Sequence, residues 1–90
     1  MSVYIDSFRS PFGNMIMNHM IADTKEELLD MVDKIGVKRK WIQKEETIWE
    51  HFDICESKKI LAIRHGAIQV ETMELARKMV GKKKEKIHDI

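Results

Sequence analysis

The stretch His51-Phe52-Asp53-Ile54-Cys55-Glu56-Ser57-Lys58-Lys59 joins a short extended run to the expected start of a helix. Phe52 and Ile54 alternate with polar residues, which is the pattern of a strand buried on one face. In such a strand His51 and Asp53 project together from the other face. We therefore interpret this stretch as one wall of a polar site, and we expect the rest of the chain to build a surface around it.

The length and composition indicate one small globular domain. The chain has 90 residues, of which 43% are hydrophobic and 34% are charged. A domain of this size buries little apolar surface, so a homo-oligomer is a reasonable expectation. No apolar run could cross a membrane and no signal peptide is evident at the N-terminus, so we expect a cytoplasmic protein. Cys55 is the only cysteine, which excludes an internal disulfide and fits a reducing compartment.

The net charge of +1 is too small for a dedicated nucleic-acid-binding protein, so we regard nucleic acid as a less favoured partner. Basic residues nevertheless form local clusters at residues 38–40, 58–59 and 82–84, while acidic residues gather between residues 26 and 33. This distribution favours a small anionic ligand over a long polymer.

The first half of the chain predicts two strands and a helix. Alternation at residues 3–6 predicts a strand with Asp6 at its carboxyl end, and the proline and glycine of residues 7–14 predict a turn. Residues 15–22 favour a second strand. A helix then begins at Asp23 or Thr24, each followed three residues later by a glutamate, and ends at Gly36.

The second half predicts further strands and helices. Residues 37–43 resemble a third strand and residues 44–50 a loop. A helix from about Ser57 to His65, a strand at 67–70 and a helix that Thr72 caps and Gly81 ends complete a domain of residues 1–81, with a charged, frayed tail at 82–90. The predicted fold class is α/β: a small mixed, partly parallel sheet of about four strands covered by about three helices, in the order strand-strand-helix-strand-helix-strand-helix.

Four polar residues are candidates for a metal or catalytic site: Asp6, His19, His51 and Asp53. Ligands in sheets of this kind gather beyond the carboxyl ends of strands, where Asp6 and the 51–59 stretch would lie. Two imidazoles and two carboxylates can hold a divalent metal with positions left open for water. The alternatives are a local hydrogen bond between His51 and Asp53, a structural role for His19, and helix capping for Asp23.

A second group of residues is suited to phosphate. Lysines beside the N–H groups of a helix start can bind an anion, and an arginine can bind phosphate through two donors while a tryptophan stacks on a base. The alternative is a solvated, charged surface. The candidates for ligand binding are Arg9, Arg39, Lys40, Trp41, Ser57, Lys58 and Lys59.

Five separated blocks of the sequence resemble a known family. The blocks are Val3-Tyr4-Ile5-Asp6, Arg9-Ser10-Pro11-Phe12-Gly13, residues 19–28 from His19 to Leu28, Arg39-Lys40-Trp41 and His51-Phe52-Asp53-Ile54. Together they are similar to the bacterial and phage family catalogued as domain of unknown function 4031, from residue 3 to about residue 70. The segment after residue 70 is expected to be particular to this chain.

The resemblance implies a small stand-alone protein, commonly encoded by a phage or bacterium, with no assigned activity. A phage member would act in the host cytoplasm. Some relatives are joined to a metal-dependent phosphohydrolase domain, which suggests nucleotide chemistry. The family pattern places its recurring polar positions at Asp6, Arg9, His19, Asp23, His51 and Asp53.

Three functions are compatible with the sequence. The leading hypothesis is a non-enzymatic or weakly catalytic binding protein for a phosphorylated small molecule, such as a nucleotide or nucleotide signal. The first alternative is a metal-dependent phosphoesterase or nuclease, in which Asp6, His19, His51 and Asp53 bind the divalent metal. The second is a phage protein that inhibits a host protein by direct contact, for which the seven methionines would supply an adaptable surface.

Overall fold

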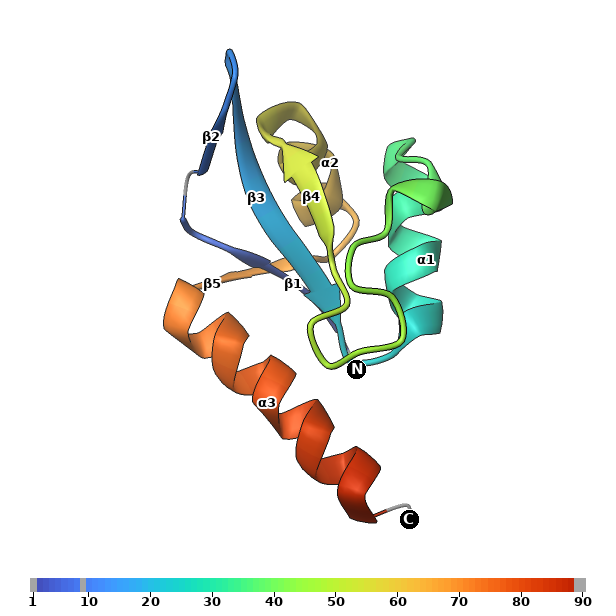
Figure 1. The fold of residues 1–90 in the computed structure, drawn as a ribbon. Helices are drawn as coiled ribbons and strands as arrows, with labels where there is room; N and C mark the ends of the chain where they lie inside the picture. Colours follow the sequence, from blue (N-terminus) through green and yellow to red (C-terminus); the bar gives the residue numbers. More distant parts are fainter. Residues whose placement is uncertain (1, 9, 89–90) are drawn as a thin grey trace.

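The chain folds as a five-stranded sheet with three α-helices (Figure 1). The computed structural model describes residues 2–8 and 10–88, and of residues 10, 12 and 82–88 it describes the backbone alone. The elements are β1 (Val3–Asp6), β2 (Ser10–Phe12), β3 (Met15–Ala22), α1 (Lys25–Ile35), the 3-10 helix η1 (Arg39–Trp41), β4 (Phe52–Cys55), α2 (Glu56–Arg64), β5 (Ile68–Val70) and α3 (Thr72–His88).

Strand β3 is the centre of the sheet. One of its edges pairs with β4, and the other pairs with β2 along its first half and with β1 along its second half, all antiparallel. Strand β5 then pairs with β1 in parallel. The sheet is therefore mixed and partly parallel, which confirms the predicted fold class. Strand β2 is an additional short strand in the segment expected to be a turn.

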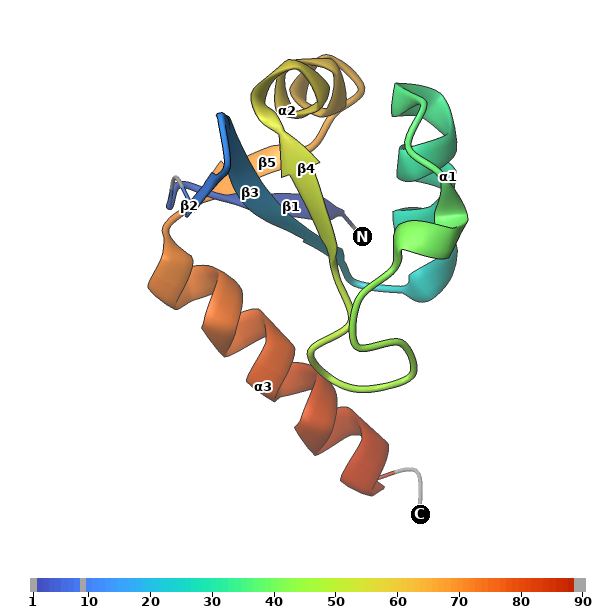
Figure 2. The same ribbon diagram turned by 45° about the horizontal axis from the view of Figure 1, so that its top comes forward.

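The helices cover both faces of the sheet (Figure 2). Apolar side chains of β1, β3 and β4 pack against α1 and α2 in the larger core, where Ile5, Met20 and Phe52 are fully buried. On the other face Ile21 packs with Leu75 and Met79 of α3. Because neighbouring strand residues point to opposite faces, Met20 and Ile21 mark the two sides of β3.

Helix α1 has the ends that the sequence predicts. The hydroxyl of Thr24 accepts a hydrogen bond from the backbone N–H of Glu27 at 3.2 Å and donates one to the Glu27 carboxylate at 2.9 Å. This reciprocal pair makes Thr24, rather than Asp23, the N-cap. Gly36 ends the helix in the left-handed conformation, at φ 78°.

Two sequence predictions about elements are wrong. Residues 37–43 do not form a strand, because Arg39–Trp41 is a 3-10 helix and only Gln43 makes a bridge, to His51, within the described part of this segment. Gly81 does not end the last helix, since α3 continues to His88. The tail expected to fray thus has a helical backbone as far as residue 88.

A membrane-spanning helix is not found among the described residues, because none of their helices combines the necessary length with sufficient apolar character.

Candidate functional site

Four polar side chains converge on the face of the sheet that α3 covers only in part. Asp6 follows Tyr4 by two residues on β1, His19 precedes Ile21 by two residues on β3, and His51 and Asp53 alternate with the buried residues of β4. The period of two along each strand therefore sends all four side chains to the α3 side. His19 and Asp53 are direct cross-strand partners in the register of β3 and β4.

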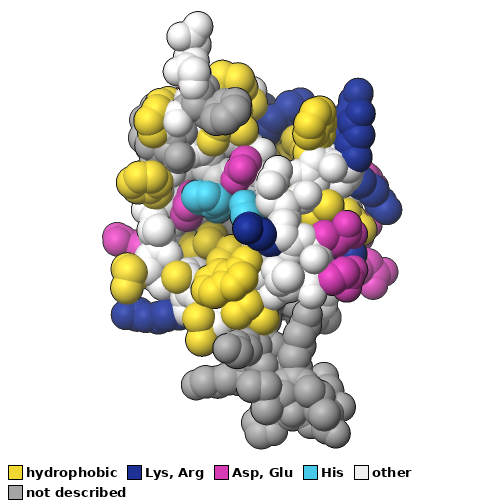
Figure 3. Space-filling view, viewed as in Figure 1, with side chains coloured by type: hydrophobic (Ala, Val, Ile, Leu, Met, Phe, Trp, Pro, Cys, Tyr) yellow, Lys and Arg dark blue, Asp and Glu magenta, His cyan; other side chains and the backbone are white. Residues whose placement is uncertain are grey.

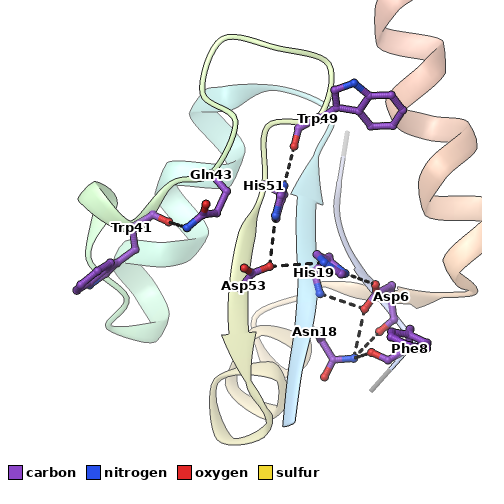
Figure 4. Close-up of polar contacts among 9 residues, drawn as sticks. All are labelled: Asp6, Phe8, Asn18, His19, Trp41, Gln43, Trp49, His51 and Asp53. Atoms are coloured by element: carbon purple, nitrogen blue, oxygen red, sulfur yellow. Dashed lines mark hydrogen bonds and ion pairs between the residues drawn. The ribbon is translucent and has the colours of Figure 1, made fainter. Parts of the chain in front are cut away.

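Asp6 is fully buried and accepts several hydrogen bonds (Figure 4). Its Oδ1 accepts from the backbone N–H of His19 at 3.0 Å, and its Oδ2 lies 2.7 Å from His19 Nδ1. The amide of Asn18 donates to Asp6 Oδ1 at 3.3 Å and to the carbonyl of Phe8 at 2.8 Å. A buried carboxylate needs such donors to replace water. Asp6 is therefore a fixed support for His19.

Each histidine ring is held at Nδ1. The Nδ1 atom of His19 lies against the Asp6 carboxylate, and Nδ1 of His51 lies 2.6 Å from the carbonyl oxygen of Trp49. Carboxylate and carbonyl oxygens only accept hydrogen bonds, so Nδ1 of each ring carries the proton. The two Nε2 atoms are left to face the remaining member of the cluster.

That remaining member is Asp53, which stands between the two Nε2 atoms. Its Oδ1 lies 3.3 Å from Nε2 of His51 and 3.6 Å from Nε2 of His19. The rings meet edge to face, with centroids 5.2 Å apart. One ligand atom from each of these three residues lies within 4.8 Å of the others. We call His19, His51 and Asp53 the HHD cluster.

The electrostatics of the HHD cluster favour a cation. When both imidazoles are neutral, two Nε2 lone pairs and a carboxylate oxygen point at one small volume. A divalent metal there would be bound by two nitrogens and one oxygen, a donor set used by catalytic zinc and by non-haem iron. Hydrogen bonds from metal-binding histidines to carboxylate or carbonyl groups are the usual support of such sites. The residues present therefore fit a metal.

The HHD cluster borders two hollows. The first has a volume of about 600 Å³ and is lined by Asp53, His19 and Trp41, with Met15 and Met17. The second, of about 330 Å³, lies between His51 and the first turns of α3. Histidine side chains are visible near the centre of this face, next to acidic, basic and hydrophobic side chains (Figure 3). The cluster is thus accessible to a ligand.

Arg39 is not brought to the HHD cluster. Its guanidinium donates to both carboxylate oxygens of Asp33, from Nε at 3.0 Å and from Nη2 at 2.6 Å. This contact raises the pKa of Arg39 and lowers the pKa of Asp33 below its ordinary value. Arg39 thus pairs with α1. The sequence predicts Asp33 only as part of an acidic stretch and does not predict its pairing with Arg39.

The other phosphate-binding candidates have different surroundings. Trp41 lines the first hollow, and Lys40 Nζ lies 5.3 Å from its ring centroid. Lys58 lines an adjoining hollow of about 290 Å³ that also touches Trp41 and Asp53. Lys59 is half buried on α2. Arg9 lies outside the described residues, so its predicted role stays a prediction.

Ser57 interacts with the only cysteine instead of with the cluster. Its Oγ lies 3.3 Å from Sγ of Cys55, which is the N-cap of α2. The Ser57 hydroxyl, followed by the backbone N–H groups at the start of α2, lowers the pKa of the Cys55 thiol, and partial burial opposes this effect. Cys55 lines the adjoining hollow of about 290 Å³.

Sequence reasoning missed two residues that support the site. Asn18 positions Asp6, and Trp49 supplies the carbonyl that orients His51. Asn18 had a signal in the sequence, since it is a polar residue inside an apolar strand. The carbonyl of Trp49 had no such signal, because every residue has a backbone carbonyl and the residue type does not indicate which one binds His51.

The chain was compared with known proteins. No curated protein and no solved structure matches it. One family model does match, over residues 3–82, and this range extends beyond residue 70 to include the first part of α3. The expectation that the segment after residue 70 is particular to this chain is therefore wrong. The chain belongs to the family described as protein of unknown function (DUF4031).

Proposed function

We propose that this protein is a metal-dependent phosphoester hydrolase whose divalent metal is bound by Nε2 of His19, Nε2 of His51 and the carboxylate of Asp53. The observation that carries the proposal is the orientation of the two rings. Both Nδ1 atoms are engaged by fixed acceptors, at 2.7 Å and 2.6 Å, so both Nε2 atoms face Asp53. Neutral rings held in this way present two Nε2 lone pairs beside the Asp53 carboxylate, which is a donor set for a divalent metal.

Three protein ligands leave coordination positions for water and substrate, as in catalytic zinc sites. A metal bound there would polarise a phosphoryl oxygen and lower the pKa of a bound water. The chain's own residues then have separate roles. His19, His51 and Asp53 bind the metal, and Asp6 holds the His19 ring in the required tautomer. Asp6 is a positioning residue in this proposal, because its oxygens are already occupied.

Lysines near the cluster support phosphate as the reacting group. Lys44 lines the second hollow together with His19 and His51, and Lys38 and Lys58 line the hollow that adjoins the first. Together with the metal they would neutralise the negative charge of a phosphoester. A phosphorylated small molecule, such as a nucleotide, is the substrate class that we propose.

A binding protein that does not hydrolyse its ligand is the second candidate. The exposed ring of Trp41 beside the lysines favours it, because an indole and a cation together recognise a nucleotide. Both functions use the same hollows beside the HHD cluster. They differ in whether the metal-loaded protein turns its ligand over.

Calorimetric titration of the metal-free protein with Zn²⁺ and Mn²⁺ tests the proposal. One ion should bind per chain, and His19→Ala, His51→Ala and Asp53→Asn should each abolish or greatly weaken binding. His65→Ala is the matched control, since His65 lies at the end of α2 on a different part of the surface. The metal-loaded protein should release product from a chromogenic phosphoester.

Binding of neither ion would refute the metal site. Metal binding without hydrolysis, accompanied by stabilisation of the protein by a nucleotide, would favour the binding protein over the hydrolase.

A further inference from the structure

The two hollows beside the HHD cluster lie on either side of the proposed metal. His19 lines both of them, whereas Asp53 lines the first and His51 the second. A metal bound to these three residues would therefore border both spaces. Their volumes, about 600 and about 330 Å³, each fall in the range of ligand-binding sites. The site thus offers room for a substituent on each side of the reacting phosphorus.

Each hollow contains one of the chain's two tryptophans. Trp41 is 57% exposed and Trp49 is 46% exposed, although large aromatic side chains are mostly well buried in folded proteins. The close-up shows the two indoles on opposite sides of the cluster (Figure 4). Exposed indole faces in ligand-sized hollows are suited to stacking with planar rings.

The backbones of the two tryptophans make different local contacts. The carbonyl of Trp49 accepts from His51 Nδ1, so its backbone is anchored to a proposed metal ligand. Trp41 belongs to the 3-10 helix, and its carbonyl accepts from Gln43 Nε2 at 3.5 Å. Gln43 in turn bridges to His51 through the backbone. Both aromatic walls are therefore connected to the segment that carries His51.

We infer that the substrate is a phosphodiester joining two planar-ring groups, of which a dinucleoside monophosphate is the simplest example. This inference rests on the proposed function. The phosphate would lie at the metal, with one ring against Trp41 and the other against Trp49. A phosphomonoester would leave one hollow empty. The small net charge agrees with a short diester rather than a long nucleic acid.

The reaction is a simple hydrolysis. The oxygen of a water molecule forms a bond to phosphorus, and the bond from phosphorus to one ester oxygen breaks. That ester oxygen takes a proton from the water and leaves as an alcohol. The products are one phosphomonoester and one alcohol in equal amounts, and no oxidant or further reactant is needed.

The test compares the dinucleoside monophosphate of two adenosines with adenosine 5′-monophosphate, using the Zn²⁺-loaded full chain. A phosphorothioate form of the diester keeps the negative charge and resists hydrolysis, so it serves for binding. Trp41→Phe and Trp49→Phe each leave a single indole, whose fluorescence reports stacking at one hollow. The diester analogue should quench the indole fluorescence of both variants. It should also bind at least about tenfold more tightly than the mononucleotide.

Truncation of either indole supplies the second measurement. Trp41→Ala and Trp49→Ala should each raise KM for the natural diester by about tenfold or more, and neither should change the affinity for Zn²⁺. Methyl 4-nitrophenyl phosphate carries one ring, so only one of the two variants should affect its hydrolysis. Ile63→Ala, at an exposed position of α2, is the control and should not change the hydrolysis of either substrate.

Two results would overturn the inference: quenching in only one of the phenylalanine variants, or hydrolysis of the monoester in preference to the diester. Either result, obtained with a protein that binds Zn²⁺ and hydrolyses phosphoesters, would leave the proposed function standing. Failure to bind Zn²⁺ would instead remove the proposed function together with this inference. The metal titration therefore separates the two failures.

Discussion

Asp6 is the side chain on which the orientation of His19 depends. It is fully buried, and its two oxygens contact the backbone and the ring of the same histidine. A carboxylate in this position fixes the tautomer and the angle of the ring, and it makes Nε2 a better donor to a metal. Burial of the Asp6 carboxylate costs free energy, and the hydrogen bonds donated by His19 and Asn18 offset that cost.

We expect Asp6→Asn to lower metal affinity by about 10- to 100-fold, the usual effect of removing such a supporting group. The amide cannot accept at both oxygen positions, so the His19 ring loses its fixed tautomer. Calorimetric titration with Zn²⁺ measures the change, and circular dichroism checks that the variant is folded. Asp30→Asn, on the exposed side of α1, is the control. An unchanged dissociation constant in a folded Asp6→Asn protein would contradict the role given to Asp6.

Cys55 should react as a thiolate at lower pH in the folded chain than in the unfolded chain. The Ser57 hydroxyl and the N–H groups at the start of α2 lower the pKa of its thiol. Because the folded-state pKa is the lower one, this contact adds stability as the pH rises through that value, and the contribution is lost as the pH falls. The rate of alkylation by iodoacetamide, measured against pH, reports the midpoint.

Ser57→Ala should move that midpoint upward, towards the value in urea, because the largest cause of the lowered pKa is removed. Ser7→Ala, at an exposed position between β1 and β2, should leave it unchanged. If the folded and unfolded proteins react with the same pH profile, the Ser57 contact does not exist in solution.

Much of the HHD cluster could be predicted from residue types. His19 is conspicuous as a polar residue in an apolar strand, and His51 and Asp53 alternate with buried residues. The sequence could not supply the register that places Asp53 opposite His19. It also could not show that Asp6 supports His19 while His19, His51 and Asp53 form the proposed metal site. Register depends on contacts between distant segments, and periodicity within one segment does not contain them.

At the scale of elements, the loop at residues 44–50 controls the position of His51. Lys44 and Glu46 have positive φ angles of 54° and 65°, which costs a residue other than glycine roughly 1–2 kcal/mol. Glu50 is buried and accepts from the backbone N–H of Glu46 at 2.9 Å. Lys25 of α1 pairs with Glu45, Glu46 and Glu50. These contacts hold the loop in an otherwise unfavourable conformation.

Lys25→Met should loosen this loop. The three glutamates lose their shared cation, so amide hydrogen exchange at residues 44–50 should become faster. If the ordered loop is then present in about a third of the molecules, the apparent metal affinity falls about threefold. Lys34→Met, at the other end of the same helix, is the matched control. Unchanged exchange in the Lys25→Met protein would show that the backbone contacts of Glu50 are sufficient.

Elements with strong end signals were predicted well, and those without them were not. Thr24, Glu27 and Gly36 define α1 by local chemistry alone. The segment at 37–43 has the alternation of a strand, but Arg39 turns back to Asp33 on α1, a contact that no pattern within the segment contains. Gly81 has the residue type of a helix end, yet the backbone there remains helical. Glycine weakens a helix interior by only about 1 kcal/mol, which neighbouring turns can offset.

For the whole molecule, the proposed metal should contribute to folding stability. Its ligands come from β3 and from β4 with the residue before it, so only the folded chain presents them together. At a free metal concentration of 100 times Kd, the free energy of unfolding should rise by about 2.7 kcal/mol. Urea unfolding with and without Zn²⁺ measures this gain. His51→Ala should remove it, whereas His65→Ala should keep it; equal stability with and without metal would contradict the site.

The overall architecture followed from element order, because helices between strands require crossovers and some parallel pairing. That reasoning gave the mixed sheet with three helices. It did not show that α3 alone covers one face, which is why part of that face, with the HHD cluster on it, is left open.

The pairing of His19 with Asp53 across β3 and β4 also makes the site a sensor of strand alignment. A slip of one residue between these strands would turn the side chains of one of them to the α1 side, and the three donor atoms would no longer meet. A misaligned molecule would therefore keep its secondary structure and lose the proposed metal site. Titration with a metal would count the correctly aligned molecules in a sample, which neither circular dichroism nor gel filtration can do.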